Sequence, residues 1–336
     1  ENSSPVHQFR AMWGLWVFHL VKGQLANAHG LAENLLSLAN REQNSYLLIK
    51  THEALGSSYF FLGRFDEART HLFAAKSLHD PTQHRSHTLL YGQDPGITAR
   101  IWLAWTVWIL GEVEHAETLA QEALGKAREL EHPFTLVFTL ANLSRIYTSF
   151  HNVNRALEFA DEALAVSTQY SFALGLALAT ASQGWALAEQ GHEAGLGKLI
   201  HGISATRVTG ANLNIPFTLA LLAEIYLRNK RIDEGLGTIE EAQKLAGTGG
   251  ELFWHAELLR LKGELLLAQS DLSVQAAEQC FSEALKIAQA QHATMLELRA
   301  ATSLARLWKT LNKVDEAKRI LQPVYARFHE CVDNLE

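Results

Sequence analysis

The chain has 336 residues, 48% of them hydrophobic, with only 6 Pro and 22 Gly. This composition predicts a folded, helix-rich protein with a continuous core, and it leaves no room for a long disordered tract. The formal net charge of −7 argues against nucleic acid as a direct partner, because neutralising phosphates requires a basic face.

The cysteines and the apolar runs indicate the cellular location that we expect for the chain. Cys280 and Cys331 are its only cysteines, and neither a disulfide framework nor a cysteine zinc site fits their spacing, so a reducing cytoplasm is favoured. The longest apolar run, residues 97–114, is interrupted by Arg100 and is shorter than the roughly 20 apolar residues of a membrane-spanning helix. No membrane partner is expected. The chain starts without Met or a signal sequence, so we interpret it as a fragment of a longer protein.

A short turn recurs along the chain, mostly at intervals of about 40 residues. Glycine or a polar residue occupies its centre, as expected where the chain leaves a helix with a backbone conformation that branched side chains avoid. In chain order the turns are "KGQLANA" at Gly23, "LGRFDEA" at Gly63, "LGEVEHA" at Gly111, "FHNVNRA" at His151, "QGHEAGL" at Gly191, "NKRIDEG" at Lys230 and "LNKVDEA" at Asn312. A further unit with a longer turn surrounds Gly263.

The clearest repeat unit lies between Ala54 and Leu78, "ALGSSYFFLGRFDEARTHLFAAKSL". Its first half places the small Gly56 where two helices approach closely, with Tyr59 beside it. Its second half carries one apolar stripe at helical spacing, formed by Phe65, Ala68, Leu72, Ala75 and Leu78. This is the packing pattern of a helix–turn–helix repeat of the tetratricopeptide type.

Eight such helix pairs account for the whole chain. The sequence therefore predicts an all-α protein, an α-solenoid with a period of about 40 residues that winds into a right-handed superhelix. Because each pair buries its apolar face only against its neighbours, residues 1–336 are expected to form a single repeat domain.

An insertion is predicted at residues 79–96, "HDPTQHRSHTLLYGQDPG", because Gly63 and Gly111 are 48 residues apart. Asp94 followed by Pro95 has the pattern of an N-cap and first helical residue, and it predicts the start of the third helix pair. Asp80 followed by Pro81 predicts a short helix over residues 81–91 in the same way.

One face of that short helix carries side chains that a metal site could use. Asp80, His84, His87 and Tyr91 follow helical spacing, and histidine and carboxylate are zinc ligands. Asp80 is taken by the helix cap, however, and no fourth ligand is evident. We therefore interpret this face as structure and expect neither a metal nor another cofactor in the chain.

Several strings carry a more specific resemblance. The insertion, together with "GWALAEQG", "AELLRLKGELLLAQ" and "LELRAATSLARLW", resembles the C-terminal repeat region of large bacterial signalling proteins that carry an AAA-type, STAND-like ATPase, often behind an adenylate or guanylate cyclase domain. The resemblance implies a sensor or scaffold arm attached to a nucleotide switch. A more distant likeness is to regulators of the maltose-activator type, whose similar superhelix binds an inducer sugar.

Enzymatic motifs are missing from the sequence. The string "GHEAGLGKLI" fails as a phosphate-binding loop, because Gly191 lies one position too far from Lys198 and Leu199 replaces the residue that would hold magnesium. No GxGxxG, HExxH or GxSxG motif occurs. We therefore expect that the chain is not an enzyme and that any catalysis by a parent protein lies outside it.

The binding residues are expected on the concave face, which the first helix of each pair lines in such repeats. Aromatic residues and arginine are the side chains that contribute most to binding surfaces. Projection of the repeat pattern places on this face Glu53, Phe60, Trp102, Trp105, Trp108, Asn142, Arg145, Trp185, Glu224, Arg228, Arg260, Glu264, Arg306 and Lys309.

We single out nine of these positions as candidates for partner binding, and two alternatives stay open for them. The tryptophans of the third pair could fill the core, and the charged residues could pair across neighbouring repeats. If the charged side chains of the concave face do not pair, packing does not require them, and we expect them to face solvent in the groove. The nine are Trp105, Asn142, Arg145, Trp185, Glu224, Arg228, Arg260, Glu264 and Arg306.

Two classes of partner are compatible with this face. A protein or peptide, or a domain of the parent chain itself, would use an open groove. A small-molecule inducer would use a deep, aromatic-lined pocket. Binding of a chaperone tail is disfavoured, because Ala141 replaces the first lysine of the known carboxylate clamp.

Overall fold

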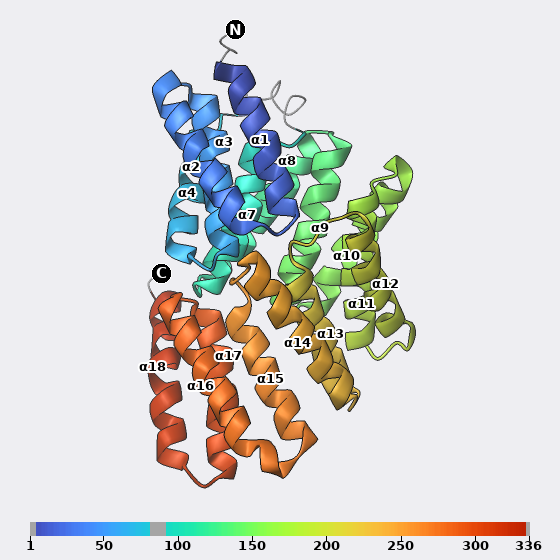
Figure 1. Cartoon of the computed structure of the whole chain (residues 1–336), viewed down its shortest axis with the longest axis vertical. Helices are drawn as coiled ribbons and strands as arrows, with labels where there is room; N and C mark the ends of the chain where they lie inside the picture. The colour runs from blue at the N-terminus through green and yellow to red at the C-terminus, as the bar shows by residue number, and fades with distance from the viewer. Residues whose placement is uncertain (1–4, 81–91, 334–336) are drawn as a thin grey trace.

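The computed structural model describes residues 5–80 and 92–333, and this part of the chain contains helices and no strand (Figure 1). None of these helices combines the length and apolar character needed to cross a membrane. The α-helices are α1 (Pro5–Val21), α2 (Leu25–Glu42), α3 (Ser45–Phe61), α4 (Phe65–Leu78), α7 (Pro95–Ile109), α8 (Val113–Glu129), α9 (Pro133–Ser149), α10 (Val153–Tyr170), α11 (Ala173–Glu189), α12 (Ala194–Val208), α13 (Ile215–Arg228), α14 (Ile232–Gly249), α15 (His255–Gln269), α16 (Val274–Ala290), α17 (Thr294–Thr310) and α18 (Val314–Asp333).

The eight predicted helix pairs are confirmed, from α1–α2 through α17–α18. The turn residues adopt the left-handed backbone conformation that the sequence pattern indicates, including His151, Lys230 and Asn312, whose φ angles are 53°, 58° and 60°. The longer turn of the seventh pair contains a short 3-10 helix, Asp271–Ser273.

The predicted start of the third pair is also confirmed. The Asp94 carboxylate accepts a hydrogen bond from the Ile97 N–H at 2.9 Å, and Pro95 is the first residue of α7. His79 Nε2 lies 3.3 Å from Asp94 Oδ2, and both side chains are buried. A Cβ atom on residue 96 would lie 2.2 Å from His79 Nδ1, so glycine is required there. The two ends of the insertion are therefore held together.

The predicted short helix over residues 81–91 lies outside the described residues. The same holds for the possible metal ligands His84, His87 and Tyr91, so their interpretation as structure stays a prediction. Asp80 is the last described residue before this segment.

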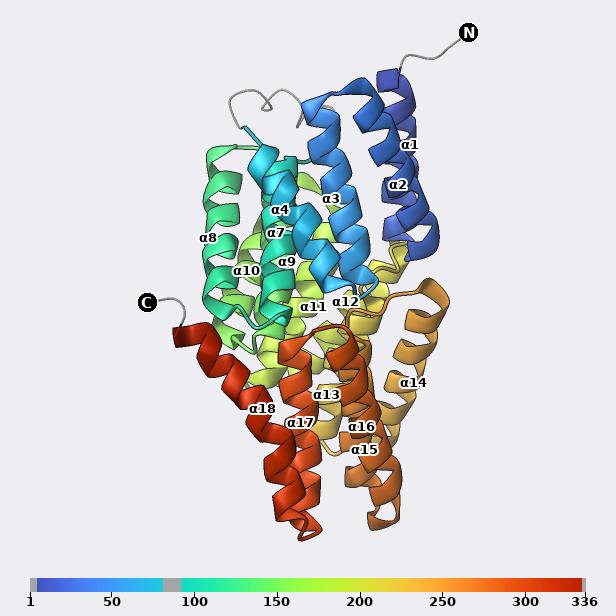
Figure 2. The same ribbon diagram turned by 90° about the vertical axis from the view of Figure 1, so that its left-hand side faces the viewer.

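The solenoid contacts itself. Helices α13–α18 lie below the body formed by α1–α12, and in Figure 2 the pairs α15–α16 and α17–α18 lie beneath α3, α4 and α7. The carbonyl of Val21 accepts a hydrogen bond from the Asn212 N–H at 2.9 Å, and the carbonyl of Phe61 accepts from Leu252 and Phe253 at 2.8 and 3.2 Å. Turns of the early pairs thus meet loops about 190 residues later. We call α1–α12 the upper body and α13–α18 the lower body.

Two further contacts join the bodies. His292 Nδ1 lies 2.6 Å from Asp66 Oδ2, and Arg299 Nη2 donates to the Ser149 carbonyl at 2.6 Å. At Gly63, which has φ of 73°, an added Cβ would lie 2.1 Å from the Gln291 side chain. Glycine at this turn suits the backbone conformation and leaves room for Gln291 in the junction.

A buried aromatic cluster occupies the junction. The rings of Phe60, Trp105, Phe217 and Phe253 lie with centroids 5.0 to 6.0 Å apart, and each side chain is fully buried. Each aromatic pair at such a distance contributes about 0.5–1.5 kcal/mol of stability beyond the contribution of the apolar area that it buries. Contact between the two bodies thus buries part of the concave face.

Candidate functional site

The structure divides the nine predicted binding residues among four environments. Trp105 and Trp185 are fully buried, so the alternative that Trp105 fills the core is confirmed. Asn142 and Arg145 lie beside an inner cavity. Arg306 is exposed on α17. The remaining four join a polar network between the bodies, namely Glu224, Arg228, Arg260 and Glu264.

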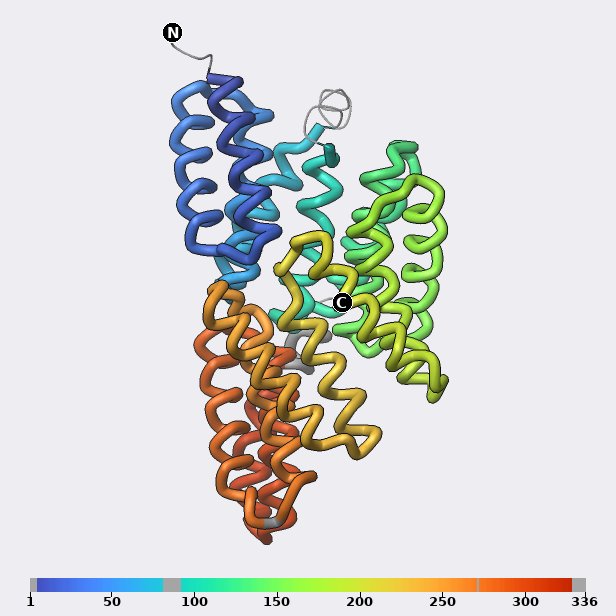
Figure 3. Tube along the Cα trace, turned by 45° about the vertical axis from the view of Figure 1, so that its right-hand side comes forward, coloured from blue at the N-terminus to red at the C-terminus, as the bar shows by residue number. Residues whose placement is uncertain are grey.

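The inner cavity has a volume of about 550 Å³, is half open to its surroundings and is lined mainly by the upper body. Its walls come mainly from the first helices of the first five pairs, α1, α3, α7, α9 and α11. The segment between α12 and α13 also lines it, and Figure 3 shows this yellow segment between the blue N-terminal helices and the green ones. Small-molecule sites have volumes of about 300–1,000 Å³, so the cavity is of suitable size.

Aromatic and aliphatic side chains together line the cavity. They arise because the first helices direct their inner faces toward the superhelix axis, as the repeat pattern predicts. Of the three tryptophans of α7, Trp102 lines the cavity, whereas Trp105 and Trp108, about one and two turns further along the helix, are buried in the core. The aromatic lining consists of Trp13, Trp16, Trp102, Phe134, Phe138 and Phe172.

Arg145 is the cation of this cavity. It is 5% exposed, so its expected solvent-facing position is wrong; the lower body covers the face that an open solenoid would expose. Its Nη1 donates to Asn142 Oδ1 at 3.4 Å, and its guanidinium lies 5.5 Å from the Trp105 ring and 5.8 Å from the Phe217 ring. Burial lowers the pKa of Arg145 to about 10, against the opposing charge of Glu251. The side chain is still a cation at neutral pH.

Glu251 lies behind Arg145 in the loop before α15. Both of its carboxylate oxygens accept from the Asn214 N–H, at 3.1 and 3.0 Å. Burial raises the pKa of Glu251 to about 8, although the Asn214 N–H and the Arg145 charge both favour the ionised form. Its negative charge therefore compensates Arg145 incompletely near neutral pH.

Glu53 also lines the cavity, and its carboxylate is already paired with Lys50. Lys50 Nζ donates to Glu53 Oε2 at 2.7 Å, and its ammonium lies 3.8 Å from the Trp13 ring centroid. Both charges are buried. Burial raises the pKa of Glu53 to about 7 and lowers that of Lys50, and each partner opposes the shift of the other.

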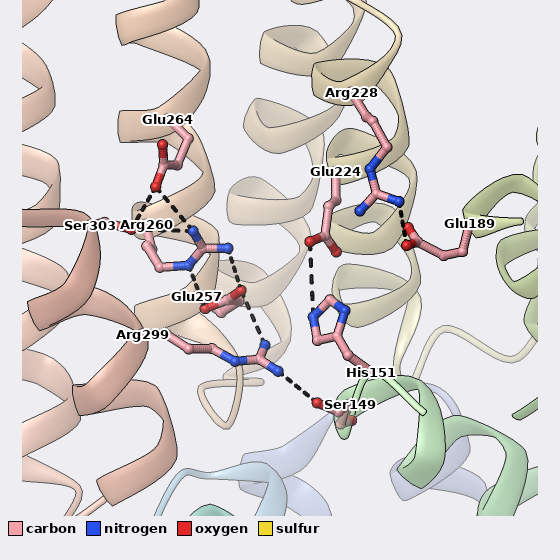
Figure 4. A network of polar contacts seen from close by, with 10 residues as sticks. All are labelled: Ser149, His151, Glu189, Glu224, Arg228, Glu257, Arg260, Glu264, Arg299 and Ser303. Carbon is pink, nitrogen blue, oxygen red and sulfur yellow. Dashed lines mark hydrogen bonds and ion pairs between the residues drawn. The ribbon is translucent and has the colours of Figure 1, made fainter. Parts of the chain in front are cut away.

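The polar network is centred on Glu257 of α15 (Figure 4). Arg260 donates to both Glu257 oxygens, at 2.9 and 2.8 Å, and Arg299 Nη1 donates to Oε1 at 3.3 Å. The second arm of Arg299 reaches the Ser149 carbonyl in the upper body. Burial raises the pKa of Glu257, but the charges of Arg260 and Arg299 outweigh it and lower the pKa to about 2.

The outer part of the network contains the other predicted residues. Glu264 Oε1 accepts from Ser303 Oγ at 2.6 Å and from Arg260 Nη1 at 3.3 Å. Figure 4 shows Glu224 facing His151, whose Nε2 lies 3.9 Å away, and Arg228 paired with Glu189. The predicted alternative, pairing across neighbouring repeats, describes the contact of Arg228 with Glu189. Glu224 instead faces His151 two repeats earlier, and Arg260 pairs with Glu257 and Glu264 on its own helix.

His151 connects the network to the upper body. Burial, followed by the nearby Arg299 charge, lowers the pKa of His151 to about 4. The pKa of Glu224 is raised by burial and by the negative charge of Glu257. At neutral pH His151 is therefore uncharged, and the cations of the network are arginines.

Sequence reasoning missed several of these side chains. Trp13 and Trp16 follow from the same repeat projection extended to the first pair. Glu257 lies one turn before Arg260 on the same helix face, which is a local signal. The contact of Arg299 with Ser149 spans 150 residues and depends on the closure of the superhelix, which no local pattern encodes.

Within residues 5–80 and 92–333, no three His, Cys, Asp or Glu side chains are grouped as metal ligands would be. The described residues thus form a largely apolar cavity with Arg145 on its wall, beside a charged contact between two parts of the chain.

Comparison with known proteins agrees with the repeat architecture. Residues 51–72 and 139–169 match family models described as tetratricopeptide repeat. Protein R02095 of Rhizobium meliloti (strain 1021) is 22% identical over 303 residues, which are 89% of this chain and 29% of that protein. The chain thus spans less than a third of this relative's length.

Solved structures share the fold at low sequence identity. A Rap protein complexed with competence and sporulation factor has a TM-score of 0.62 and 14% identity, covering 97% of this chain and 99% of that one. Aspartyl phosphate phosphatase F from Bacillus subtilis has a TM-score of 0.51 and 10% identity, covering 97% and 94%. The chain is therefore an all-α repeat solenoid of this general kind.

Proposed function

We propose that the chain is the sensor domain of a larger signalling protein, and that it recognises a small ligand or a short chain segment in the inner cavity. The observation that carries this proposal is the cavity itself: about 550 Å³, lined by aromatic side chains, inside the concave face. A pocket of this kind favours the inducer-type sensor over a scaffold that grips a domain in an open groove.

The closure of the superhelix supports the same function. The aromatic cluster and the polar network occupy the concave surface where the two bodies meet, so an extended partner finds little open groove there. The segment that covers the cavity, which includes Asn214, belongs to the connection between the bodies. A ligand that contacts this segment favours the closed arrangement over any opened one, which is the requirement for a sensor.

The comparisons are compatible with a ligand-binding part of a larger protein. The Rap protein that shares the fold is complexed with competence and sporulation factor, so a fold of this kind accommodates a bound factor. The Rhizobium meliloti relative is more than three times as long as the matched region. Attachment to a STAND-type ATPase or a cyclase, and a cytoplasmic location, belong to this proposal.

A cavity-filling variant tests the sensor function. Leu178 lines the cavity on α11, whereas Leu176 on the same helix is 39% exposed. N-phenyl-1-naphthylamine, a neutral dye that fluoresces in apolar surroundings, should bind the unmodified chain. Leu178→Trp should weaken this binding at least tenfold by filling the cavity, and the matched control Leu176→Trp should leave it unchanged.

The same variants then screen for the natural ligand. Fractions of a small-molecule extract that raise the melting temperature of the unmodified chain and of Leu176→Trp, but not of Leu178→Trp, contain a cavity ligand, because ligand binding stabilises the folded state. Dye binding that is absent, or equal in both tryptophan variants, would contradict the proposed function.

A further inference from the structure

The inner cavity contains a buried cation whose hydrogen-bonding capacity is largely unused. Within the described part of the chain, the one hydrogen bond of the Arg145 guanidinium is the 3.4 Å contact with Asn142. Its Nε and Nη2 are enclosed by protein atoms and have no hydrogen-bond partner there. Burial in this state is costly, because the guanidinium loses its hydration and gains little in return.

The surroundings of Arg145 do not supply a counterion in direct contact. Two aromatic rings lie against it, which provide cation–π attraction without accepting a strong hydrogen bond. The carboxylate of Glu251 is directed to the Asn214 N–H, and no ion pair between Glu251 and Arg145 forms among the described residues. Arg145 thus lines the cavity as a cation that an incoming anion would satisfy.

We propose that the inner cavity binds an apolar ligand bearing a single carboxylate, and that Arg145 pairs with that carboxylate. This inference rests on the sensor function proposed above. Nε and Nη2 share one edge of the guanidinium, and the parallel N–H groups of such an edge match the two oxygens of a carboxylate. Protein atoms enclose this edge in the ligand-free chain. Binding therefore requires the guanidinium to turn toward the cavity, at the expense of the long hydrogen bond to Asn142 and of contact with the Trp105 and Phe217 rings.

The charges around the cavity favour a monoanion. Arg145 offers one positive charge, and the Lys50 ammonium is already bonded to Glu53. A doubly charged phosphate would leave one negative charge uncompensated beside the Glu53 carboxyl group, at a high desolvation cost. A carboxylate balances Arg145 alone.

The walls favour an apolar body on the same ligand. Trp13, Trp16 and Trp102 provide large rings for packing, and burial of apolar surface contributes about 25 cal/mol per Å². Two sources have this chemistry, a free small carboxylic acid and the C-terminal end of a peptide, and the cavity volume admits either.

A pair of dyes that differ in one anionic group tests the inference. 8-Anilinonaphthalene-1-sulfonate is N-phenyl-1-naphthylamine with an added sulfonate, a monoanion. The unmodified chain should bind the sulfonate at least tenfold more tightly than the neutral dye. Arg145→Met, which keeps the side-chain length, should abolish this preference while leaving the neutral dye's affinity within twofold. The matched control Arg306→Met, at an exposed position, should keep the preference.

Competition experiments distinguish the sources of the carboxylate. 3-Phenylpropionate should displace the sulfonate dye from the unmodified chain, and 3-phenylpropanamide should not. The tripeptide Ala-Leu-Phe should be compared in its free-acid and C-terminally amidated forms. Displacement by the small acid assigns a free carboxylic acid, and displacement by the peptide acid alone assigns a peptide C-terminus. Equal displacement by acids and amides would overturn the inference.

These experiments distinguish a failure of the proposed sensor function from a failure of the proposed role of Arg145. If neither dye responds to Leu178→Trp, the sensor function itself is wrong. If both dyes enter the cavity but Arg145→Met leaves the preference for the anion unchanged, the sensor function stands and the role of Arg145 is wrong. Should Arg145→Met not fold, Arg145→Lys serves instead: it keeps the charge but lacks the bidentate edge, and it should reduce the preference by at least threefold.

Discussion

Two buried glutamates six residues apart show how differently the cavity region and the polar network treat a charge. Glu251, near the cavity, is 4% exposed and its pKa is raised to about 8; Glu257, in the network, is 3% exposed and its pKa is lowered to about 2. Burial raises both. The difference is that Glu257 contacts Arg260 and Arg299 directly, whereas Glu251 has only a backbone N–H and a distant arginine.

Buried charged side chains thus have different roles in the two regions. In the network the charges are satisfied by one another and hold the lower body against the upper body. Beside the cavity, Arg145 and Glu251 are incompletely compensated, which lowers stability and leaves binding capacity for a ligand. Variants in each region test this difference.

The largest effect is expected for Glu257→Gln. This change leaves Arg260 and Arg299 buried without their carboxylate, and breaking a buried ion pair costs about 3–5 kcal/mol. Urea unfolding at pH 7 measures the loss. The control is Glu264→Gln, whose side chain is 24% exposed; it should cost about 1 kcal/mol or less. Equal losses for the two variants would show that Glu257 is not the centre of the network.

Opposite pH dependences are expected for Glu251→Gln and Glu257→Gln. The pKa of Glu251 is raised on folding, so the unmodified chain loses stability relative to Glu251→Gln as pH rises from about 4.5 to 8. The pKa of Glu257 is lowered, so its stabilisation is present above about pH 4.5 and is lost as pH falls toward 2.

Unfolding titrations from pH 2 to 9 measure both profiles. The slopes cannot exceed about 1.4 kcal/mol per pH unit for a single group. Below pH 6.5 His151 adds a further acid-induced loss, because its pKa is lowered to about 4 in the folded chain. Parallel profiles for the two glutamine variants would contradict the difference between the regions.

A smaller effect is expected for the stability of Arg145→Met. Replacing an incompletely paired buried cation by an apolar side chain is often neutral or stabilising, so the free energy of unfolding should change by no more than about 1 kcal/mol. Arg260→Met, which removes a bidentate partner from Glu257, should lose about 3 kcal/mol or more by the same measurement. A loss of that size in Arg145→Met would instead assign Arg145 a structural role.

The smallest effect is expected for Arg306→Ala. This arginine is exposed on α17, and surface changes of this kind usually stay within about 0.5 kcal/mol. Thermal unfolding should therefore coincide with that of the unmodified chain. A clear loss would place Arg306 in a contact comparable to those of the network.

The repeat architecture was predictable because its determinants are local. Turns such as the one at His151, and the cap at Asp94, depend on residues within a few positions of each other. The same projection selected Asn142 and Arg145, which line the cavity, and Arg260 and Glu264, which belong to the polar network, because helical spacing decides which residues share a helix face. Helical spacing does not predict which residues of distant repeats those side chains contact.

Spacing along the chain sets the eight helix pairs, their turns and the inner helix faces. Closure of the solenoid on itself depends on contacts between distant residues, with the Phe61 carbonyl bonded to Leu252 and Phe253 and the Ser149 carbonyl to Arg299. The physical reason is that small rotations between neighbouring pairs accumulate over the array. Their sum determines whether an inward residue such as Arg145 faces solvent, a cavity or another part of the chain.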